Sequence, residues 1–90
     1  MATLPDNQHP DFPTDTVMKI IVRQGKKDEA FPRIEEVFND MEIPAREWKS
    51  RYSGKKNYVS LHTEVTIESS EQLHTLYARL GDIPGVRYIL

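Results

Sequence analysis

The chain has 90 residues, of which 38% are hydrophobic and 29% are charged, and its formal net charge is −2 at pH 7. This length and composition predict one small globular domain that is neither disordered nor membrane-spanning. The sequence contains no cysteine, which excludes disulfides and thiolate metal sites, and its slight acidity gives no general attraction to nucleic acid or anionic lipid.

The first fourteen residues, MATLPDNQHPDFPT, contain several prolines and neither lysine nor arginine. A secretory signal needs a basic start followed by an apolar stretch, and this segment has neither. We therefore expect residues 1–14 to form a flexible arm, residues 15–90 to form a single domain, and the protein to be cytoplasmic.

Residues 15–23 are rich in β-branched and apolar types, which predicts a first strand. Its side chains alternate between two faces, with Met18, Ile20 and Val22 on one face and Lys19, Ile21 and Arg23 on the other. The polar segment QGKKDEA then forms a connection, and Pro32 is expected in the first turn of a helix, where its missing N–H is harmless. The apolar stripe of this helix comprises Ile34, Val37, Phe38 and Met41, and Pro44 ends the helix.

A second strand is expected over residues 45–52, although its apolar signal is little more than Trp48 and Tyr52. Turn residues at 53–57 then predict a hairpin to a third strand over residues 58–68. In this third strand one face carries Val59, Leu61, Thr63, Val65 and Ile67, and the other carries Tyr58, Ser60, His62, Glu64 and Thr66.

Ser69 and Gln72 have the spacing of a capping box and predict the start of a second helix. The apolar stripe of this helix comprises Leu73, Leu76, Tyr77 and Leu80. Gly81 follows the stripe, where a left-handed helix cap is easiest for glycine. The chain then ends in a short strand, and alternation predicts that Val86, Tyr88 and Leu90 share one of its faces.

This order, β-α-β-β-α-β, predicts an α+β fold. Each helix has one apolar stripe, and the long third strand is apolar on one face only. Two helices must therefore cover one face of a four-stranded antiparallel sheet and leave the other face in water. With right-handed crossovers, the ferredoxin-like sandwich is the natural arrangement, with both stripes packed onto the apolar face of the sheet.

The end of the chain resembles a known family. LYARLGDIPGVRYIL, residues 76–90, is similar to the LYxxLGxxxxVRxxL ending of the YbeD-like family of small bacterial proteins, which is a domain of unknown function. Phe12-Pro13, Lys19 and the NYxS pattern that starts at Asn57 agree with the family in the same order, so the resemblance covers residues 12–90. It implies a ferredoxin-like fold close to the ACT regulatory domains of metabolic enzymes such as phosphoglycerate dehydrogenase. It implies no activity, cofactor or catalytic residue.

The stretch SGKKNYVSLHTEV raises the question of RNA binding, because a basic turn leads into a strand that carries an aromatic side chain. RNA-binding sheets usually stack two or three bases on aromatics of their central strands. Here only Tyr58 lies on the open face of the third strand, and the first strand has no aromatic. A single stack contributes about 1–3 kcal/mol, which is too little to hold an RNA strand. RNA binding is therefore the least favoured function.

An enzyme is not expected either. His62 and Glu64 share one strand face and could be two metal ligands, but no third ligand of suitable spacing follows. Ser60 has His62 two residues away, but no buried acid is evident to orient the histidine. We therefore predict no catalytic residue, no cofactor and no metal site.

Two non-enzymatic functions remain. In the first, a regulatory or adaptor module uses its open sheet face and basic hairpin to contact an unidentified protein partner, with a homodimer as an alternative. The predicted contact residues are Lys19, Arg46, Lys49, Arg51, Lys55, Lys56, Tyr58, His62 and Arg87. The alternative interpretation is that these charges lie on an edge strand and only prevent sheet-to-sheet association.

The second function is metabolite sensing. By resemblance to ACT domains, which bind small metabolites near the first strand–helix loop, a small ligand would bind at a loop marked by Gly25 and Pro32. Neither function involves nucleic acid or a membrane.

Overall fold

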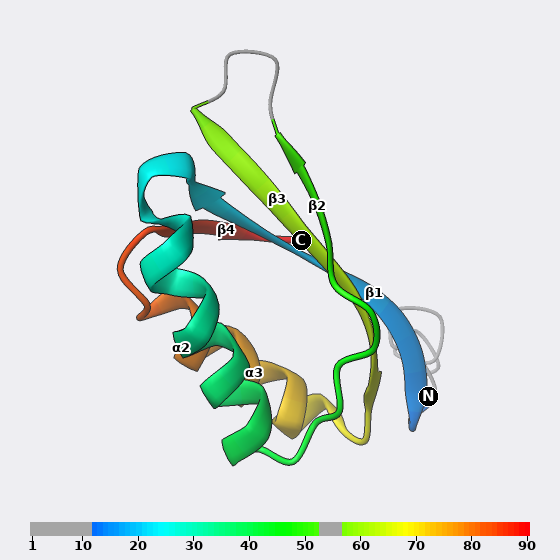
Figure 1. Ribbon diagram of the computed structural model, residues 1–90. Helices are drawn as coiled ribbons and strands as arrows, with labels where there is room; N and C mark the ends of the chain where they lie inside the picture. The colour runs from blue at the N-terminus through cyan, green and yellow to red at the C-terminus, as the bar shows by residue number, and fades with distance from the viewer. Residues whose placement is uncertain (1–11, 53–56) are drawn as a thin grey trace, which may run out of the picture.

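The computed structural model describes residues 12–52 and 57–90. Its elements follow the order β1 (Thr14–Arg23), η1 (Gln24–Lys26), α2 (Lys27–Asp40), β2 (Lys49–Tyr52), β3 (Tyr58–Ile67), α3 (Ser70–Gly81) and β4 (Val86–Ile89). The strands form one antiparallel sheet in the order β2-β3-β1-β4, and both helices lie on one face of it (Figure 1). The predicted ferredoxin-like architecture is confirmed. Of the predicted arm, only the last residues are described, and Thr14 already belongs to β1.

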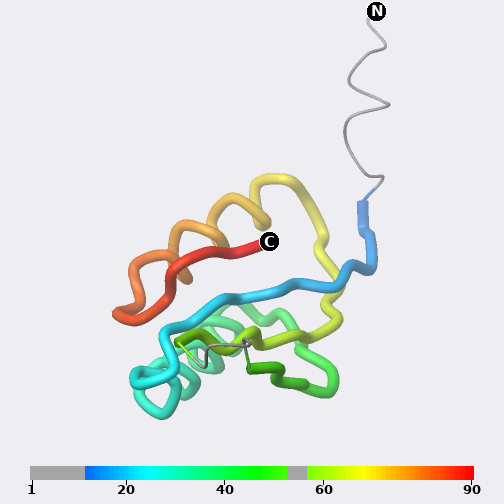
Figure 2. Tube along the Cα trace, turned by 90° about the horizontal axis from the view of Figure 1, so that it is seen from above, coloured from blue at the N-terminus to red at the C-terminus, as the bar shows by residue number. Residues whose placement is uncertain are grey.

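The core lies between the helices and the two central strands, β1 and β3. Figure 2 shows β1 running between β4 and β3. The antiparallel register pairs Met18 with Thr63 and Ile20 with Leu61, and all four side chains are buried. The predicted helix stripes pack against them, and their buried members are Ile34, Val37, Phe38, Leu76 and Leu80. Tyr77 is 38% exposed, so its predicted place in the core is wrong.

α2 begins five residues earlier than Pro32 predicts. The segment expected to be a polar connection forms the short 3₁₀ helix η1 and the first turn of α2. In this turn the negative charges of Asp28 and Glu29 interact favourably with the positive end of the helix dipole. The early start lets Ala30 enter the core with no exposed surface. Pro32 lies inside the helix and has no N–H to donate to the Asp28 carbonyl. Because Pro32 is exposed, water can bind this carbonyl instead.

The last strand does not alternate as predicted. The pairing of β4 with β1 shifts register at one point, where Arg87 is the extra residue of a β-bulge. The bulge turns Val86 and Ile89 toward the helices, where both are half-buried, and leaves Tyr88 on the open face. Tyr88 and Leu90 therefore share a face, but Val86 does not.

The ends of α3 match the prediction at one terminus only. Ser69 Oγ accepts a hydrogen bond of 3.1 Å from the Gln72 amide, and Gln72 Oε1 accepts one of 2.7 Å from the Glu68 amide. The predicted left-handed cap at Gly81 is wrong, because Gly81 is the last residue of α3 and the cap residue Asp82 is helical. Among the described glycines, the left-handed conformation belongs to Gly85, at a φ of 98°.

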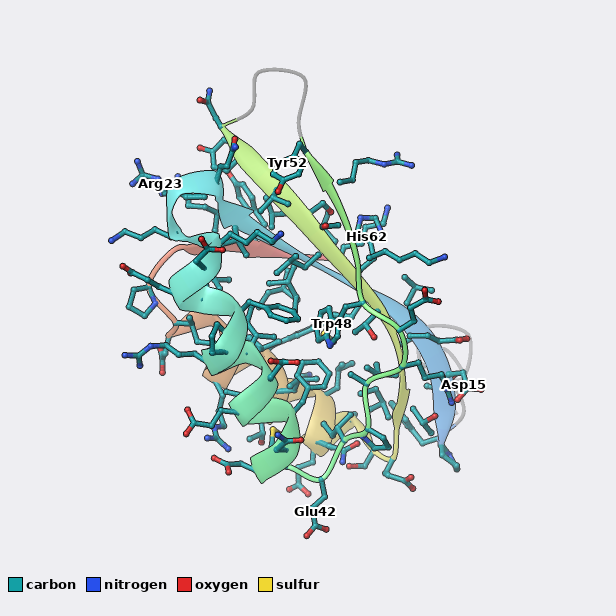
Figure 3. All side chains as sticks on the ribbon, viewed as in Figure 1. Asp15, Arg23, Glu42, Trp48, Tyr52 and His62 are labelled. Carbon is teal, nitrogen blue, oxygen red and sulfur yellow. The ribbon has the colours of Figure 1, made fainter. Side chains whose placement is uncertain are left out.

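β2 is shorter than predicted, because it begins at Lys49 rather than at Ala45. Ala45 instead makes an isolated bridge to Val65. Trp48 is half-buried and packs edge-on against Phe31 and Phe38 of α2, with ring centroids 5.2 and 5.5 Å apart. Figure 3 shows Trp48 on the helix side of the sheet and His62 on the opposite side. The Trp48 ring therefore fixes the segment before β2 against α2.

Candidate functional site: a cationic pocket at the end of the open sheet face

A row of basic side chains crosses the open face of the sheet. Lys49 of β2 pairs with His62 of β3, and His62 pairs with Lys19 of β1. Lys19 exchanges backbone hydrogen bonds of 3.1 and 2.8 Å with Leu90, which places Leu90 beside it. Residues that are directly opposite across an antiparallel pair point to the same face. The structure therefore brings Lys19, Lys49 and His62 together, as the sequence predicts.

The adjacent row explains the electrostatics of His62. Arg51 of β2 pairs with Ser60 of β3, and the Ser60 hydroxyl shares a hydrogen bond of 2.8 Å with Nε2 of His62. Partial burial lowers the pKa of His62 below its ordinary value, and the positive charges of Lys19, Arg51 and Lys49 lower this pKa further. The neutral imidazole is therefore favoured, and the surroundings of His62 are net positive.

Arg46 differs from these cations because it makes ion pairs with two carboxylates. Its guanidinium lies 3.6 Å from the Asp15 carboxylate and 3.5 Å from the Glu64 carboxylate, and it donates a hydrogen bond of 3.0 Å to the Thr66 hydroxyl. The Thr66 hydroxyl donates to Asp15 at 2.6 Å, and this bond is the largest cause that lowers the pKa of Asp15. Arg46 is thus neutralised at the far end of the sheet from the β1–α2 turn.

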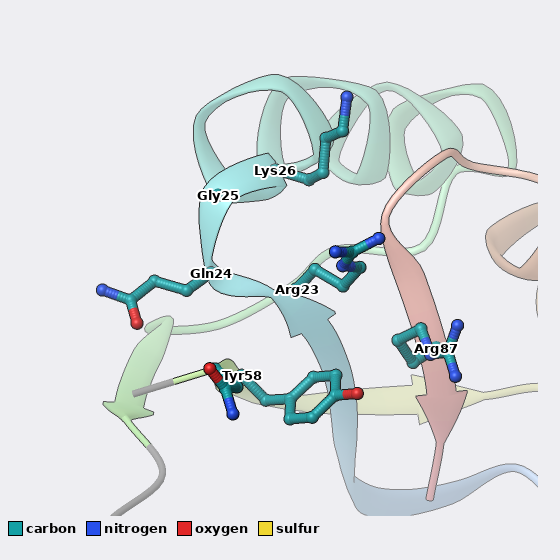
Figure 4. A pocket seen from close by; sticks show the side chains of 7 residues that line it. Arg23, Gln24, Gly25, Lys26, Tyr58 and Arg87 are labelled. Carbon is teal, nitrogen blue, oxygen red and sulfur yellow. The ribbon is translucent and has the colours of Figure 1, made fainter. Parts of the chain in front are cut away.

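A pocket of about 770 Å³ opens where β1 runs into η1. Figure 4 shows Arg23 and Arg87 on neighbouring strands, with the ring of Tyr58 extending between β3 and Arg87. The Lys26 side chain extends away from the two arginines, and its ammonium lies 3.6 Å from the Glu29 carboxylate. No acidic side chain is among the described residues that line the pocket, which are Arg23, Gln24, Gly25, Lys26, Asn57, Tyr58 and Arg87.

Backbone hydrogen bonds hold the three walls of this pocket together. The Arg23 amide donates to the Gly85 carbonyl at 2.9 Å, which joins the end of β1 to the turn before β4. The Gln24 amide donates to the Asn57 carbonyl at 3.0 Å, which joins η1 to the start of β3. The pocket is therefore fixed by the sheet itself and not by loop packing alone.

The pocket combines residues from both predicted sites. The sequence assigns Gly25 to a ligand loop and Tyr58 and Arg87 to a partner-binding face, and the structure brings these three residues together. Pro32 of α2 instead lines a separate pocket with Phe31 and with Trp48, which precedes β2, so the structure does not place Gly25 and Pro32 in one site. Lys55 and Lys56 lie outside the described residues. Arg23 is a pocket residue that was not predicted, although alternation along β1 places it on the open face.

Two further observations concern the described part of the chain. No three histidine, aspartate or glutamate side chains within residues 12–52 and 57–90 form a group that could hold a metal ion. Within the same ranges, no helix combines the length and apolar composition needed to span a membrane.

Comparison with known proteins gives a family and a fold. The model of a family described as "Protein of unknown function (DUF493)" matches residues 7–90. A UPF0250 protein of Idiomarina loihiensis is 31% identical over 81 residues, which is 89% of each chain. A UPF0250 protein of Shewanella sediminis is 44% identical over 41 residues, but that match spans only 46% of this chain and 47% of the relative. The resemblance seen in the sequence is therefore confirmed.

Solved structures agree on the fold at low sequence identity. Protein HP0495 of H. pylori is similar with a TM-score of 0.73 at 13% identity, covering 100% of this chain and 97% of that one. The C-terminal domain of MgtC from Mycobacterium tuberculosis gives 0.71 at 18% identity, covering 91% and 89%. The ACT domain of a GTP pyrophosphokinase from Chlorobium tepidum gives 0.64 at 18% identity, covering 86% and 97%. These similarities show an ACT-like fold.

Proposed function

The chain belongs to the DUF493 family, and from that premise we propose that it is a non-enzymatic regulatory module that binds a small anionic ligand in the pocket at the end of β1. The observation that carries the proposal is the convergence of Arg23 and Arg87 on one pocket that no described acidic side chain lines. Guanidinium groups bind carboxylate and phosphate through two parallel hydrogen bonds, so the pocket is suited to such an anion.

The size and position of the pocket support the same ligand class. Its volume of about 770 Å³ lies within the range of small-molecule sites. Gly25 places a backbone turn at the rim, and a Cβ built at this glycine would meet no atom within 4 Å. The approach to the turn is therefore open, which allows a ligand to come close to its backbone amides.

The composition of the pocket supports binding rather than catalysis. General acid–base chemistry at neutral pH is usually carried by histidine or by a carboxylate with a shifted pKa. Neither type is present among the described residues that line the pocket. The ACT-like neighbours agree with a regulatory role only at the level of the fold, since their identity to this chain is 18% or less for the structures compared above.

Calorimetric titration with inorganic phosphate and with succinate tests this proposal. We expect saturable binding of at least one of these anions, and Arg87→Gln should weaken it about tenfold, which corresponds to about 1.4 kcal/mol. Arg33→Gln is the matched control, because Arg33 is an exposed arginine on α2 outside the pocket. Gly25→Ala should keep the fold and still weaken binding. Equal affinities for wild type, Arg87→Gln and Gly25→Ala would refute the anion site.

A second candidate function, protein docking on the open sheet face, has its own supporting observation. Val17, Tyr88 and Leu90 point to this face and are 57%, 59% and 68% exposed. Large apolar side chains that gather beside charged ones on one exposed face are typical of interaction surfaces. This is the adaptor role predicted from the sequence, with a protein partner or a second copy as its occupant.

A further inference from the structure

Charges on the open sheet face are segregated along the strands. The acids Asp15 and Glu64 lie toward one end, and both are within 3.6 Å of the Arg46 guanidinium. Each of these carboxylates therefore already has a cationic partner. The remainder of the described face has a surplus of positive charge, although the chain as a whole has a net charge of −2.

The surplus is centred on His62. Lys19 lies on one side of this histidine and Lys49 on the other, with Arg51 in the next row. None of these three cations makes an ion pair with any residue in the described ranges. Two carboxylates, those of Glu47 and Glu64, line a pocket together with His62, and Glu64 is paired with Arg46. Partial burial is the first cause that lowers the pKa of His62, and the positive charges of Lys19, Arg51 and Lys49 lower this pKa further.

The acids that offset this surplus lie on another part of the surface. Glu29, Glu35, Glu36 and Asp40 line the exposed side of α2, together with Arg33. α2 covers the opposite face of the sheet (Figure 1). The molecule therefore has an acidic helix side and a basic sheet side, and a partner for the sheet side should be acidic.

The spacing of the face suits an extended polypeptide. Lys49, His62 and Lys19 lie on three adjacent strands, which are about 4.8 Å apart in a sheet. Alternate side chains of an extended segment repeat about every 6.6 Å, so neighbouring carboxylates can reach different cations. Ile21 and Tyr88, which pair with each other in the adjacent row, offer apolar contacts beside these cations.

Nucleic acid suits the face less well. Single strands bind to sheets by stacking bases on aromatic side chains of the central strands. On the open face of β1 and β3, the described residues include one such ring, that of Tyr58, and it lines the anion pocket. The basic row around His62 contains no tyrosine, phenylalanine or tryptophan.

We propose that the open sheet face binds an acidic, extended segment of a partner protein, whose carboxylates contact Lys19, Lys49 and Arg51 around His62. This inference rests on the proposed docking function of the face and is independent of the anion pocket. It adds the chemistry of the partner, which the sequence left open.

Titration of the isotope-labelled full chain with a hexaglutamate peptide tests the inference. We expect saturable amide shifts at Lys19, Lys49, Arg51 and His62 and a marked loss of affinity when the salt concentration rises. Lys19→Glu should weaken binding about tenfold, whereas Arg33→Glu, which makes the same change in charge on α2, should leave it unchanged. Phosphate binding should be the same in both variants, which separates this face from the pocket.

The imidazole of His62 supplies a second readout. A carboxylate bound among the cations opposes the positive charges that lower the pKa of His62, so the peptide should raise this pKa. The affinity of the peptide should accordingly rise as the pH falls through the pKa of His62. A bound peptide that leaves the His62 titration unchanged would contradict the proposed placement.

Four other outcomes would overturn the inference in distinguishable ways. If hexaglutamine binds as tightly as hexaglutamate, a peptide still binds this face, but its carboxylates are not required. Hexauridylate that binds more tightly than hexaglutamate, rather than at the non-specific level of about 10⁻⁴ M, would identify a nucleic-acid surface. Self-association that Lys19→Glu abolishes would show that the occupant of the face is a second copy of the chain. No binding of any probe would refute docking on this face altogether.

Discussion

Gly85 is the residue whose replacement the structure tolerates least well among the described glycines. Its φ of 98° is a conformation that other residues adopt only with strain, and a Cβ at this position would lie 2.5 Å from Cβ of Lys26. The Gly85 carbonyl also accepts the hydrogen bond from Arg23 that joins β1 to the last turn. This glycine therefore links the stability of the fold to the shape of the pocket.

Replacing Gly85 by alanine should lower the free energy of unfolding by about 1–3 kcal/mol through backbone strain, with a further loss from the contact with Lys26. Gly81→Ala is the control, because Gly81 is helical and a Cβ there would meet nothing within 4 Å. That substitution should be neutral or stabilising by up to about 1 kcal/mol. Urea denaturation measures both, and equal stability of the two variants would contradict this account of the turn.

The placement of single residues follows from the sequence where the backbone is regular. Alternation in β1 and β3 correctly places Lys19 and His62 on the open face. Arg87 could not be placed in this way, because a bulge changes the phase of β4 and leaves no mark in the pattern of apolar residues. The neutralisation of Arg46 was also not predictable. Glu64 lies beside Arg46 because Ala45 bridges Val65, and Asp15 lies near it because β1 pairs with β3.

At the scale of elements, the sequence best predicts the helices and strands whose apolar residues recur with a regular period. The stripe of α3 and the long alternation of β3 identify both elements to within one residue of their ends. β2 carries no such signal, because all four of its residues are exposed. The predicted start of α2 at Pro32 is wrong, because the exposed position of this proline allows it inside the helix.

Two core residues, Ile43 and Ile83, lie outside any periodic segment. Each follows a helix and is tied back to it by a backbone hydrogen bond, from the Ile43 amide to the Phe38 carbonyl at 2.9 Å and from the Ile83 amide to the Leu80 carbonyl at 3.1 Å. They are 2% and 7% exposed. Isolated apolar residues of this kind can be assigned to the core only when the path of the chain after the helix is known.

Neighbouring positions on α3 provide a test of the packing. Leu76 has no exposed surface, so Leu76→Ala should lower the free energy of unfolding by about 2–5 kcal/mol by leaving a cavity. Tyr77 is 38% exposed despite its place in the predicted stripe, so Tyr77→Ala should have a clearly smaller effect. Thermal and urea denaturation measure both changes. A Leu76→Ala variant as stable as wild type would rule out this position of the helix in the core.

At the scale of the whole molecule, the fold creates two surfaces that the composition does not show. The pocket draws on η1, the start of β3 and the bulge of β4, which are brought together by the strand order β2-β3-β1-β4. The opposite charges of the helix side and the sheet side likewise average to a small net charge. The class of fold could be predicted from the sequence, but the site could not, because it depends on register and on a bulge.

The central claim is that an anion binds where Arg23 and Arg87 meet, and amide chemical shifts test it most directly. The labelled full chain is titrated with inorganic phosphate in exchange for chloride at constant ionic strength. We predict saturable shifts at residues 23–26, 57–58 and 87, and their disappearance in Arg87→Gln but not in Lys19→Glu. Shifts that do not saturate and that occur equally at every exposed lysine and arginine would show only non-specific association of phosphate. That result would contradict a specific anion site.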